Sequence, residues 1–365
     1  MIPKSIAEVT PEWLGEQLGA SVSAFEPAQI GQGVGIMGDI FRVALSYTDD
    51  AGTSSAGGER PGSVVVKLPS SFEENRAQGI ALGMFEAEVR FYRELGQEVS
   101  VGLPKIYHAD IEPGTADFVL VMEDLTDLIT VPQAQGMSAE QALAAVTVLA
   151  HVHATWWDKA QTSALEWIPS MTGDRIAGLE PVLAGLLPSF LDKFADKLPA
   201  GGQAVYEAFA GNYMSIMQRL AADSPWTLVH QDFRVENLLF GTGADDRVIV
   251  LDWQGIGRGP GAYDLAYALG GSMTSALRRS EEDGLLAAYH AQLTALGISG
   301  YSLAALKEDY ALAQLTGGLA TPILIGGGMD LSNERGVELI TTMARRHVQA
   351  ALDHEGPALL RQLVG

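Results

Sequence analysis

The stretch Leu228–Gly257, LVHQDFRVENLLFGTGADDRVIVLDWQGIG, is the most informative part of this 365-residue chain. Short segments rich in strand-forming residues stand next to two acidic residues in it, Asp232 and Asp252. Asn237 lies fifteen residues before Asp252, and two strands joined by a short turn would bring these two side chains to the same end of a hairpin. A carboxylate facing an amide oxygen forms a site of hard oxygen ligands, which suits Mg²⁺ that also holds phosphate oxygens.

Two more side chains on the loop before Asn237 carry reactive groups. Asp232, five residues before Asn237, would point to the space beside the metal and accept a proton from an attacking hydroxyl, or orient it. Arg234 can neutralise charge on a transferring phosphoryl group. A lone His-x-Asp pattern is weak evidence, because a loop histidine bonded to a nearby aspartate is common. A zinc site is an alternative, but His230 has no second histidine at ligand spacing.

The composition limits the fold class and the partners. With 45 Asp and Glu against 23 Lys and Arg, the net charge is −22, and the sequence contains no cysteine. A chain of 365 residues exceeds the usual size of one compact domain, which predicts two lobes. The absence of cysteine excludes disulfides, thiolate metal sites and cysteine nucleophiles, and it fits a reducing compartment. Negative charge spread along the chain argues against nucleic acid and anionic lipid as partners, since these need clustered Lys and Arg.

The residue pattern changes near residue 122. Before it, strand formers dominate the segments 40–47, 63–68 and 118–122. Helices are predicted over 11–18, with a proline in the first turn, and over 81–95, with apolar residues at helical spacing. After residue 122 helical patterns prevail, and a capping box from Ser138 to Gln141 opens the first long apolar helix. We therefore predict an α+β protein with a β-rich amino-terminal lobe and a mainly helical carboxy-terminal lobe.

One uncharged segment, Ala311–Met329, needs to be tested as a membrane span. It contains five glycines and Pro322, which make a poor apolar spanning helix, so a buried helix followed by a Gly-rich turn is the better prediction. The amino terminus shows no basic start followed by an apolar core and a cleavage site. We therefore expect a soluble, cytoplasmic protein without a membrane partner, and the sequence does not indicate its oligomeric state.

The motifs of the informative stretch resemble those of a known superfamily. His230–Asn237, HQDFRVEN, resembles the catalytic loop of the aminoglycoside phosphotransferase and choline kinase superfamily, and especially of its ecdysteroid kinase-like branch. Val250–Gln254, VLDWQ, resembles the metal-binding segment of that superfamily. Gly259–Ala266, GPGAYDLA, resembles its following Gly…Asp-Leu-Ala element, in which Asp264 would brace the catalytic loop.

The resemblance implies a protein-kinase-like two-lobe fold and a phosphotransferase that depends on ATP and Mg²⁺. The γ-phosphate would pass to a hydroxyl of a small-molecule acceptor. The implied catalytic residues are Asp232 and Arg234, and the implied metal ligands are Asn237 and Asp252. The implied division of the chain is a nucleotide-binding lobe over 1–122, a hinge over 123–126, and a catalytic and acceptor-binding lobe over 127–365.

The resemblance also implies a nucleotide site in the amino-terminal lobe. Lys67 follows the run Val64–Val66 and would hold the nucleotide phosphates. Glu88, 21 residues later, would be its acidic partner, and it fits the E-x-x-F-Y spacing of the family better than Glu86 does. Backbone groups at the hinge would receive the adenine edge, and this prediction covers Met122, Glu123 and Leu125.

The segment GQGVGIMGDIFRV supplies glycines whose backbone can approach phosphate closely. The glycines assigned to nucleotide binding are Gly33, Gly35 and Gly38. A Rossmann fingerprint is a poorer alternative, because strand-like residues and no helix follow these glycines. The glycine loop departs from the protein-kinase G-x-G-x-x-G pattern, so the roles of the individual glycines are left open.

Differences from protein kinases and two alternative functions complete the prediction. Asp252-Trp253-Gln254 stands where protein kinases have D-F-G, and no A-P-E element follows before Asp264, which favours a small-molecule kinase. A catalytically silent nucleotide-binding protein of the same fold is one alternative. A metal-dependent hydrolase is another, but it leaves Lys67 and Glu88 without a role. The acceptor is left open among an aminoglycoside, a choline-like compound, a steroid, a hydroxyacyl thioester and other hydroxylated compounds. The apolar residues of the helical lobe favour a lipophilic or acyl acceptor over a polycationic sugar.

Overall fold

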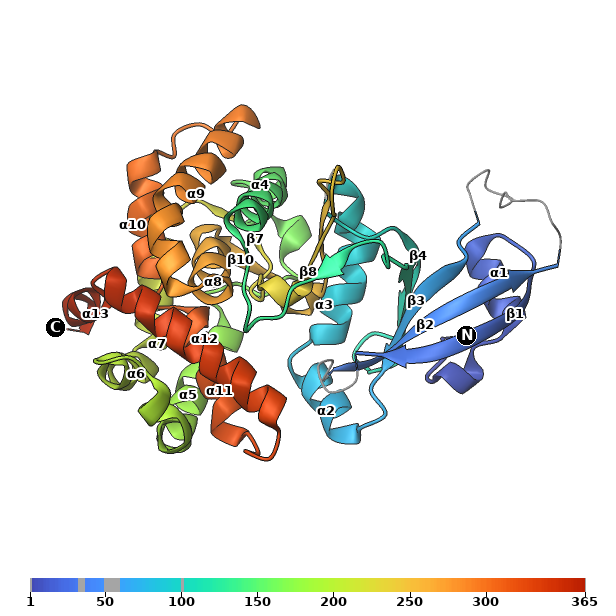
Figure 1. Cartoon of the computed structure of the whole chain (residues 1–365), viewed down its shortest axis with the longest axis horizontal. Coiled ribbons are helices and arrows are strands. Elements are labelled where there is room, and N and C mark those ends of the chain that lie inside the picture. The colour runs from blue at the N-terminus through green and yellow to red at the C-terminus, as the bar shows by residue number, and fades with distance from the viewer. Residues whose placement is uncertain (1, 32–36, 49–59, 100–101, 365) are drawn as a thin grey trace. The chain divides into compact units, whose positions relative to one another are not determined.

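The computed structural model describes residues 2–31, 37–48, 60–99 and 102–364, and the chain divides into two compact units (Figure 1). The first unit comprises Met1–Glu98, Leu103–Asp127 and Asp252–Gly255. The second comprises Val99–Gly102, Leu128–Leu251 and Ile256–Gly365. The predicted α+β class is confirmed, since the first unit contains the large sheet and the second is mainly helical. The predicted hinge over 123–126 stays a prediction.

A five-stranded antiparallel sheet forms the centre of the first unit, in the order β1-β2-β3-β5-β4. Its strands are β1 Val22–Ile30, β2 Gly38–Tyr47, β3 Ser63–Pro69, β4 Ile106–Ile111 and β5 Phe118–Glu123. The three predicted strands fall in β2, β3 and β5. On β3, Val64, Val66 and Leu68 are fully buried in one apolar cluster with side chains of the first helix. Because side chains alternate along a strand, Lys67 points to the opposite face of the sheet.

Three helical elements of the first unit accompany this sheet. Helix α1, Pro11–Leu18, is capped by Thr10, whose hydroxyl accepts a hydrogen bond from Trp13 N at 3.2 Å, as the sequence predicts. The helix predicted over 81–95 is confirmed from Met84 to Leu95, and only its start is wrong. The structure has α2, Glu73–Ala81, and α3, Met84–Arg90, which continues as a π-helical turn through Leu95. Gly83 separates α2 from α3 with a φ of +66°, a backbone conformation that glycine adopts without steric cost.

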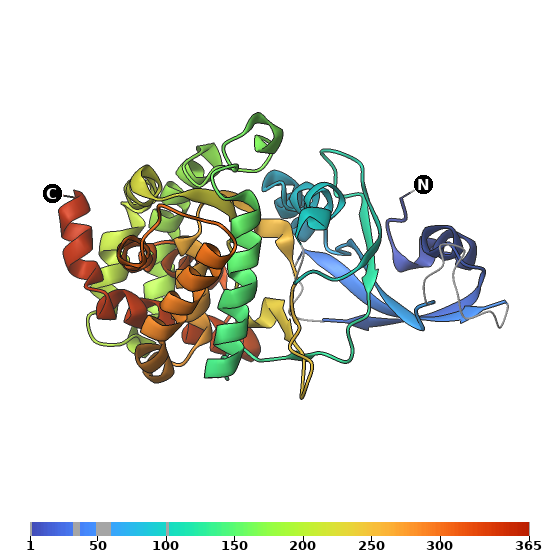
Figure 2. The same ribbon diagram turned by 90° about the horizontal axis from the view of Figure 1, so that it is seen from above.

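The second unit combines short strands with ten helices of the described chain. Two small sheets are formed, by β6 Ile129–Thr130, β8 Leu238–Phe240 and β9 Val248–Val250, and by β7 Trp226–Val229 with β10 Gly257–Pro260. The helices are α4 Ala139–Trp156, α5 Asp174–Phe194, α6 Gly202–Ala210, α7 Tyr213–Asp223, α8 Ala262–Ser272, α9 Ser275–Ala295, α10 Leu303–Ala313, α11 Gly317–Gly328, α12 Glu334–Asp353 and α13 Gly356–Val364. Helix α4, the long green helix of Figure 2, starts at the predicted capping box and packs against α9.

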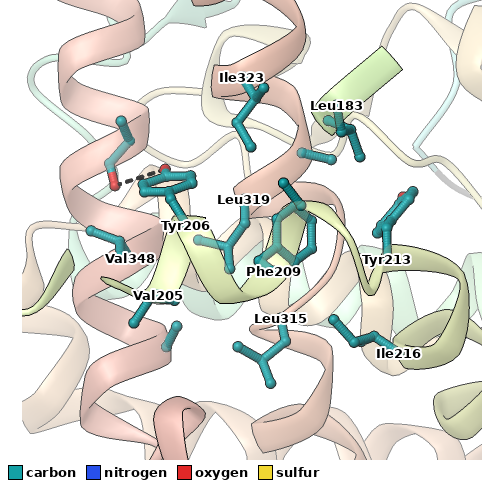
Figure 3. Close-up of a cluster of buried hydrophobic side chains, with 14 of the residues drawn as sticks. Leu183, Val205, Tyr206, Phe209, Tyr213, Ile216, Leu315, Leu319, Ile323 and Val348 are labelled. Carbon is teal, nitrogen blue, oxygen red and sulfur yellow. Dashed lines mark hydrogen bonds between the residues drawn. The ribbon is translucent and has the colours of Figure 1, made fainter. Parts of the chain in front are cut away.

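The core of the second unit is a large cluster of buried side chains from α5, α6, α7, α11 and α12. Figure 3 shows part of it, with Tyr206 and Phe209 of α6 next to Leu319 of α11. All three side chains are fully buried, and the Tyr206 hydroxyl donates a hydrogen bond to Ala344 O of α12 at 3.3 Å. This core fixes α11 and α12 relative to the rest of the second unit.

Helix α11 corrects one expectation from the sequence. The glycines predicted to form a turn after a buried helix are part of a helix themselves, since α11 runs from Gly317 to Gly328. Close packing explains their place in it: a Cβ at Gly317 would lie 1.8 Å from Tyr263 Oη, and one at Gly318 would lie 2.3 Å from His347 Nδ1. Within the described ranges, no helix combines the length and the apolar character needed to cross a bilayer.

The side chain of His347 on α12 makes the stability of the fold depend on pH. Burial, with the charges of Arg346 and Arg278, lowers the pKa of this imidazole to about 3, whereas it titrates near 6.5 in an unfolded chain. Because the unfolded chain binds a proton that the folded chain excludes, the free energy of unfolding should fall by about 1.4 kcal/mol per pH unit from about pH 6.5 towards pH 3.

Urea unfolding at pH 7.5 and pH 5.0 tests this prediction. Between these values the wild type should lose about 2 kcal/mol more than a His347→Gln variant, whose side chain does not titrate. Equal losses in the two proteins would show that His347 is not excluded from protonation in the folded state.

Candidate active site

The structure gathers the predicted site residues of the first unit around Lys67. This lysine lies on β3, paired with Ile40 of β2 on one side and with Leu120 of β5 on the other. Its side chain is buried, and Nζ lies 2.9 and 2.7 Å from the two carboxylate oxygens of Glu88 on α3. Nζ also lies 3.4 Å from Oδ1 of Asp252. The spacing argument for Glu88 over Glu86 therefore agrees with the contact, and Glu86 faces Arg90 instead.

The charges of this cluster favour a permanently charged ammonium. Burial opposes the charge on Lys67, but the Glu88 and Asp252 carboxylates outweigh it and raise the pKa of Lys67 above its usual range. Burial and the nearby Asp252 raise the pKa of Glu88, against the lowering effect of Lys67. Glu88 is almost fully buried, so its charge is best balanced by Lys67. The charge of Asp252, whose side chain is 27% exposed, then remains available for a cation.

Asp252 is held in an unusual backbone conformation. Its φ is +65°, which few residues other than glycine adopt and which aspartate tolerates better than most. Trp253 is fully buried and stacks on Phe91, with ring centroids 3.8 Å apart and planes 12° apart. Gln254 Nε2 donates to Asp252 Oδ2 at 3.3 Å. The two residues that follow Asp252 therefore fix the carboxylate that reaches Lys67.

The predicted glycines and hinge residues lie near this cluster only in part. Gly38 begins β2, opposite Pro69 of β3, whereas Gly33 and Gly35 lie outside the described residues. The three hinge residues stand at and just after the end of β5. Met122 and Leu125 are buried, and Glu123 donates its N–H to Lys105 O at 2.8 Å. Their role in adenine binding stays a prediction.

Gly38 leaves no room for a side chain. A Cβ there would lie 2.9 Å from Leu68 O and 3.4 Å from Lys67 Cε. We expect Gly38→Ala to lower the free energy of unfolding by about 1–3 kcal/mol, because a backbone atom must move to admit the methyl group. Gly62→Ala is the matched control, since a Cβ at Gly62 meets nothing within 4 Å. Urea unfolding measures both, and equal losses would contradict the prediction.

The second unit holds the other predicted site residues, which lie on the loop between β7 and β8. One Asp232 oxygen, Oδ1, accepts a hydrogen bond from Tyr267 Oη at 2.9 Å. The other, Oδ2, accepts from Asn237 Nδ2 at 2.9 Å and from Arg234 Nε at 3.3 Å. The Asp232 side chain is 31% exposed, so it remains open to solvent although three donors surround it. The three predicted residues of this loop are thus in direct contact.

Arg234 is engaged by two carboxylates of the loop. Its Nε contacts Asp232, and its Nη1 forms an ion pair with Glu236. Burial opposes its charge, but Asp232 and Glu236 raise the pKa of Arg234 above its usual range. Glu236 Oε1 in turn accepts the N–H of Gln133 at 3.1 Å. These contacts agree with the loop-supporting role considered for Arg234, and a contact with phosphate stays a prediction.

Asn237 and Asp252 have the ligand chemistry that Mg²⁺ requires. Asn237 uses Nδ2 for both of its bonds to Asp232, which leaves Oδ1 as its ligand atom. Strands β8 and β9 form the predicted hairpin. Leu238 of β8 pairs with Val250 of β9, and Leu251 N donates to Asn237 O at 2.9 Å. Within the described ranges, no three His, Cys, Asp or Glu side chains form a metal cage. Mg²⁺ commonly takes one or two protein oxygens together with substrate phosphates, so these residues fit.

A buried polar network holds the loop from behind. Asp264, at the start of α8, accepts from His230 N at 2.6 Å and from Gln231 N at 2.9 Å, which is the bracing contact that the resemblance implies. His153 Nε2 lies 3.3 Å from Asp264, and His153 Nδ1 lies 2.7 Å from Tyr289 Oη. Gln231 has a φ of +68°, so these bonds hold a strained backbone directly before Asp232.

Sequence reasoning missed two residues of this site. Tyr267 of α8 donates to Asp232, and its hydroxyl also lies 3.3 Å from Thr321 Oγ1 of α11. A signal for Tyr267 exists, because it lies three residues after Asp264 on a helix and so shares its face. Thr321 has no such signal, since its place depends on how α11 packs.

A family model described as the ecdysteroid kinase-like family matches residues 32–298 of the chain. No curated protein matches the chain by sequence.

Three of the solved structures that share the fold of this chain are named for a phosphotransferase or a kinase. A variant of aminoglycoside 2′-phosphotransferase-IIIa in complex with GDP is 12% identical, with a TM-score of 0.53 and 93% of each chain covered. Choline kinase from Cryptosporidium parvum Iowa II is 11% identical, with a TM-score of 0.52, over 93% of this chain and 92% of that one. Ethanolamine kinase from Plasmodium vivax is 13% identical, with a TM-score of 0.50, over 87% and 81%. Likeness at these identities shows the protein-kinase-like fold.

Proposed function

The chain belongs to the ecdysteroid kinase-like family, and we propose that it transfers the γ-phosphate of ATP, with Mg²⁺, to a hydroxyl of a small molecule. The observation that carries the proposal is the buried ion pair between Lys67 and Glu88, beside Asp252. A buried lysine held charged on a strand is a donor for nucleotide phosphates. A metal-dependent hydrolase that works without a nucleotide has no use for this pair.

We assign nucleotide binding to the first unit. Lys67 would donate to the α- and β-phosphates, and Glu88 would hold its ammonium in place. Gly38 lets the backbone of β2 lie close to Lys67, because a Cβ there would be 3.4 Å from Lys67 Cε. The adenine edge would meet backbone groups of Met122, Glu123 and Leu125.

We assign the reaction to the loop around Asp232. Its carboxylate would orient the acceptor hydroxyl and accept its proton as the oxygen attacks phosphorus. The exposed part of Asp232 is the face that the acceptor can reach. Arg234 would keep the loop in shape through Asp232 and Glu236.

The metal is assigned to Asn237 and Asp252. A bound Mg²⁺ would neutralise charge on the phosphates and on the leaving oxygen. Asn237 Oδ1 and the Asp252 carboxylate supply hard oxygen ligands, and their pairing on one ion rests on the resemblance of the two motifs. The cysteine-free composition suits this oxygen chemistry and a reducing compartment such as the cytoplasm.

ADP release from Mg·ATP tests the proposal. The panel should contain choline, ethanolamine, an aminoglycoside, a hydroxylated steroid and a hydroxyacyl-CoA, with a GTP arm beside the ATP arm. We expect one acceptor class to stimulate nucleotide turnover, and removal of Mg²⁺ by EDTA to abolish it. Nucleotide binding without turnover for every acceptor would favour the catalytically silent alternative, and turnover of a phosphorylated substrate without nucleotide would favour a hydrolase.

A further inference from the structure

We propose that Tyr267 is the positioning residue of the reactive loop: its hydroxyl, held by Thr321, orients the Asp232 carboxylate for phosphotransfer. This inference rests on the proposed function, because it assigns a role within that reaction. It comes from two contacts, 2.9 Å between Tyr267 Oη and Asp232 Oδ1 and 3.3 Å between Tyr267 Oη and Thr321 Oγ1.

The first argument is the geometry of the contacts between α8 and the loop. Two residues of helix α8, one helical turn apart, contact the segment 230–232 of the loop. Asp264 accepts from the backbone of His230 and Gln231, and Tyr267 donates to the side chain of Asp232. The first contact fixes the backbone, and the second fixes the rotation of the carboxylate. Without Tyr267, only donors to Oδ2 remain among the contacts of the Asp232 side chain in the described chain.

The second argument is that Tyr267 meets Asp232 as a neutral donor. Its side chain is 2% exposed, and burial, with the Asp232 charge beside it, raises its pKa well above its usual value. The phenol therefore stays protonated at any pH at which the fold is stable. A neutral donor orients the carboxylate and stabilises its charge, and it does not form the full ion pair that a lysine at this place would form.

The third argument concerns Thr321, which lies on α11, a helix whose first glycines touch side chains of α8 and α12. Gly317 and Gly318 leave no space for a Cβ against Tyr263 and His347. These glycines allow α11 to approach until the Thr321 hydroxyl reaches the tyrosine. The glycine-rich sequence of α11 thus affects the loop of Asp232 through the contact of Thr321 with Tyr267.

The simplest rival explanation is that Tyr267 is only a core aromatic residue. It stacks in parallel with Tyr263, with ring centroids 6.3 Å apart, and lies beside His347. Packing accounts for the ring, and it makes no use of the hydroxyl. Replacing each tyrosine by phenylalanine separates the two explanations, because both rings are buried on α8 and only Tyr267 contacts Asp232.

Kinetics of Tyr267→Phe and Tyr263→Phe test the positioning role. The assay is ADP release from Mg·ATP, with the acceptor of the panel that gives the highest turnover and with water alone. Tyr267→Phe should lower kcat about tenfold to a hundredfold, the effect of one hydrogen bond to a charged group, and leave the KM for ATP unchanged. Tyr263→Phe should leave kcat within about twofold of the wild type, as expected for a hydroxyl that does not contact the reactive carboxylate. Equal kcat values in the two variants would overturn the role.

A second measurement tests the contact without using activity. In thermal unfolding, Tyr267→Phe should lower Tm more in the wild-type background than in an Asp232→Ala background, where the hydroxyl keeps only its contact with Thr321. Equal Tm changes in both backgrounds would overturn the contact. A wild-type chain that binds ATP but transfers no phosphate would contradict the proposed function, whereas the thermal cycle would still decide whether Tyr267 holds Asp232.

Discussion

Asp232→Asn is expected to lower kcat by about a thousandfold, within the range of 10²–10⁴ that general base catalysis contributes. The amide keeps the shape of the carboxylate but cannot accept the proton of the acceptor hydroxyl. The structure adds a second reason. Tyr267, Asn237 and Arg234 all donate to Asp232, and an amide has only one oxygen to offer them. One donor must then face the NH₂ group of the new side chain.

The measurement is kcat for phosphotransfer, together with nucleotide binding by calorimetry and Tm. The affinity for ATP should change little, because the nucleotide contacts are assigned to the first unit. Asp223→Asn is the control, since Asp223 is exposed and pairs only with Arg219 on α7 among the described residues. Full activity of Asp232→Asn would remove the assigned role of this carboxylate.

Lys67→Met should have the largest effect on stability. The substitution keeps the length of the side chain and removes the charge that balances Glu88, which is 2% exposed. Breaking a buried ion pair by removing one partner costs about 3–5 kcal/mol, and Asp252 adds a second negative charge nearby. Loss of the ammonium group that would bind the nucleotide phosphates should also lower the rate of phosphotransfer by about a hundredfold or more.

A double variant separates the two effects of Lys67→Met. Adding Glu88→Gln removes the uncompensated negative charge, so most of the lost stability should return while activity stays low. Lys159→Met is the control, because Lys159 is exposed and its ammonium group donates only to Thr155 O in the described structure. Unfolding in urea and steady-state kinetics measure the series. Normal ATP turnover in Lys67→Met would contradict the nucleotide role.

The sequence predicted those parts of the molecule that depend on neighbours in the chain. The β-branched run Val64–Val66 forms β3, and Thr10 and Ser138 cap their helices. The contact between Glu88 and Lys67, by contrast, was implied by the resemblance of the motifs. A cap or a strand is formed by residues within a few positions of each other, and the motif around Asp232 has a fixed spacing. Such features can be read without knowledge of the packing.

The features that sequence reasoning missed depend on contacts between distant segments. Gly83 divides a helix that apolar spacing alone would continue, and its positive φ has no periodic signature. The glycines of α11 resembled a turn, because their helix is stabilised by packing against Tyr263 and His347 and not by local propensity. Thr321 reaches Tyr267 only as a result of that packing.

The discontinuous first unit has a consequence for the synthesis of this protein. Its last segment, Asp252–Gly255, emerges from the ribosome 125 residues after Asp127, since 252 − 127 = 125. At a synthesis rate of about 5–20 residues per second, roughly 6–25 s pass between the synthesis of Asp127 and that of Asp252 and Trp253. During that interval the ring of Phe91 lacks the cover that Trp253 gives it. A chain cut after residue 127 would lack Trp253 permanently, so the first unit is incomplete as a separate module without the segment Asp252–Gly255.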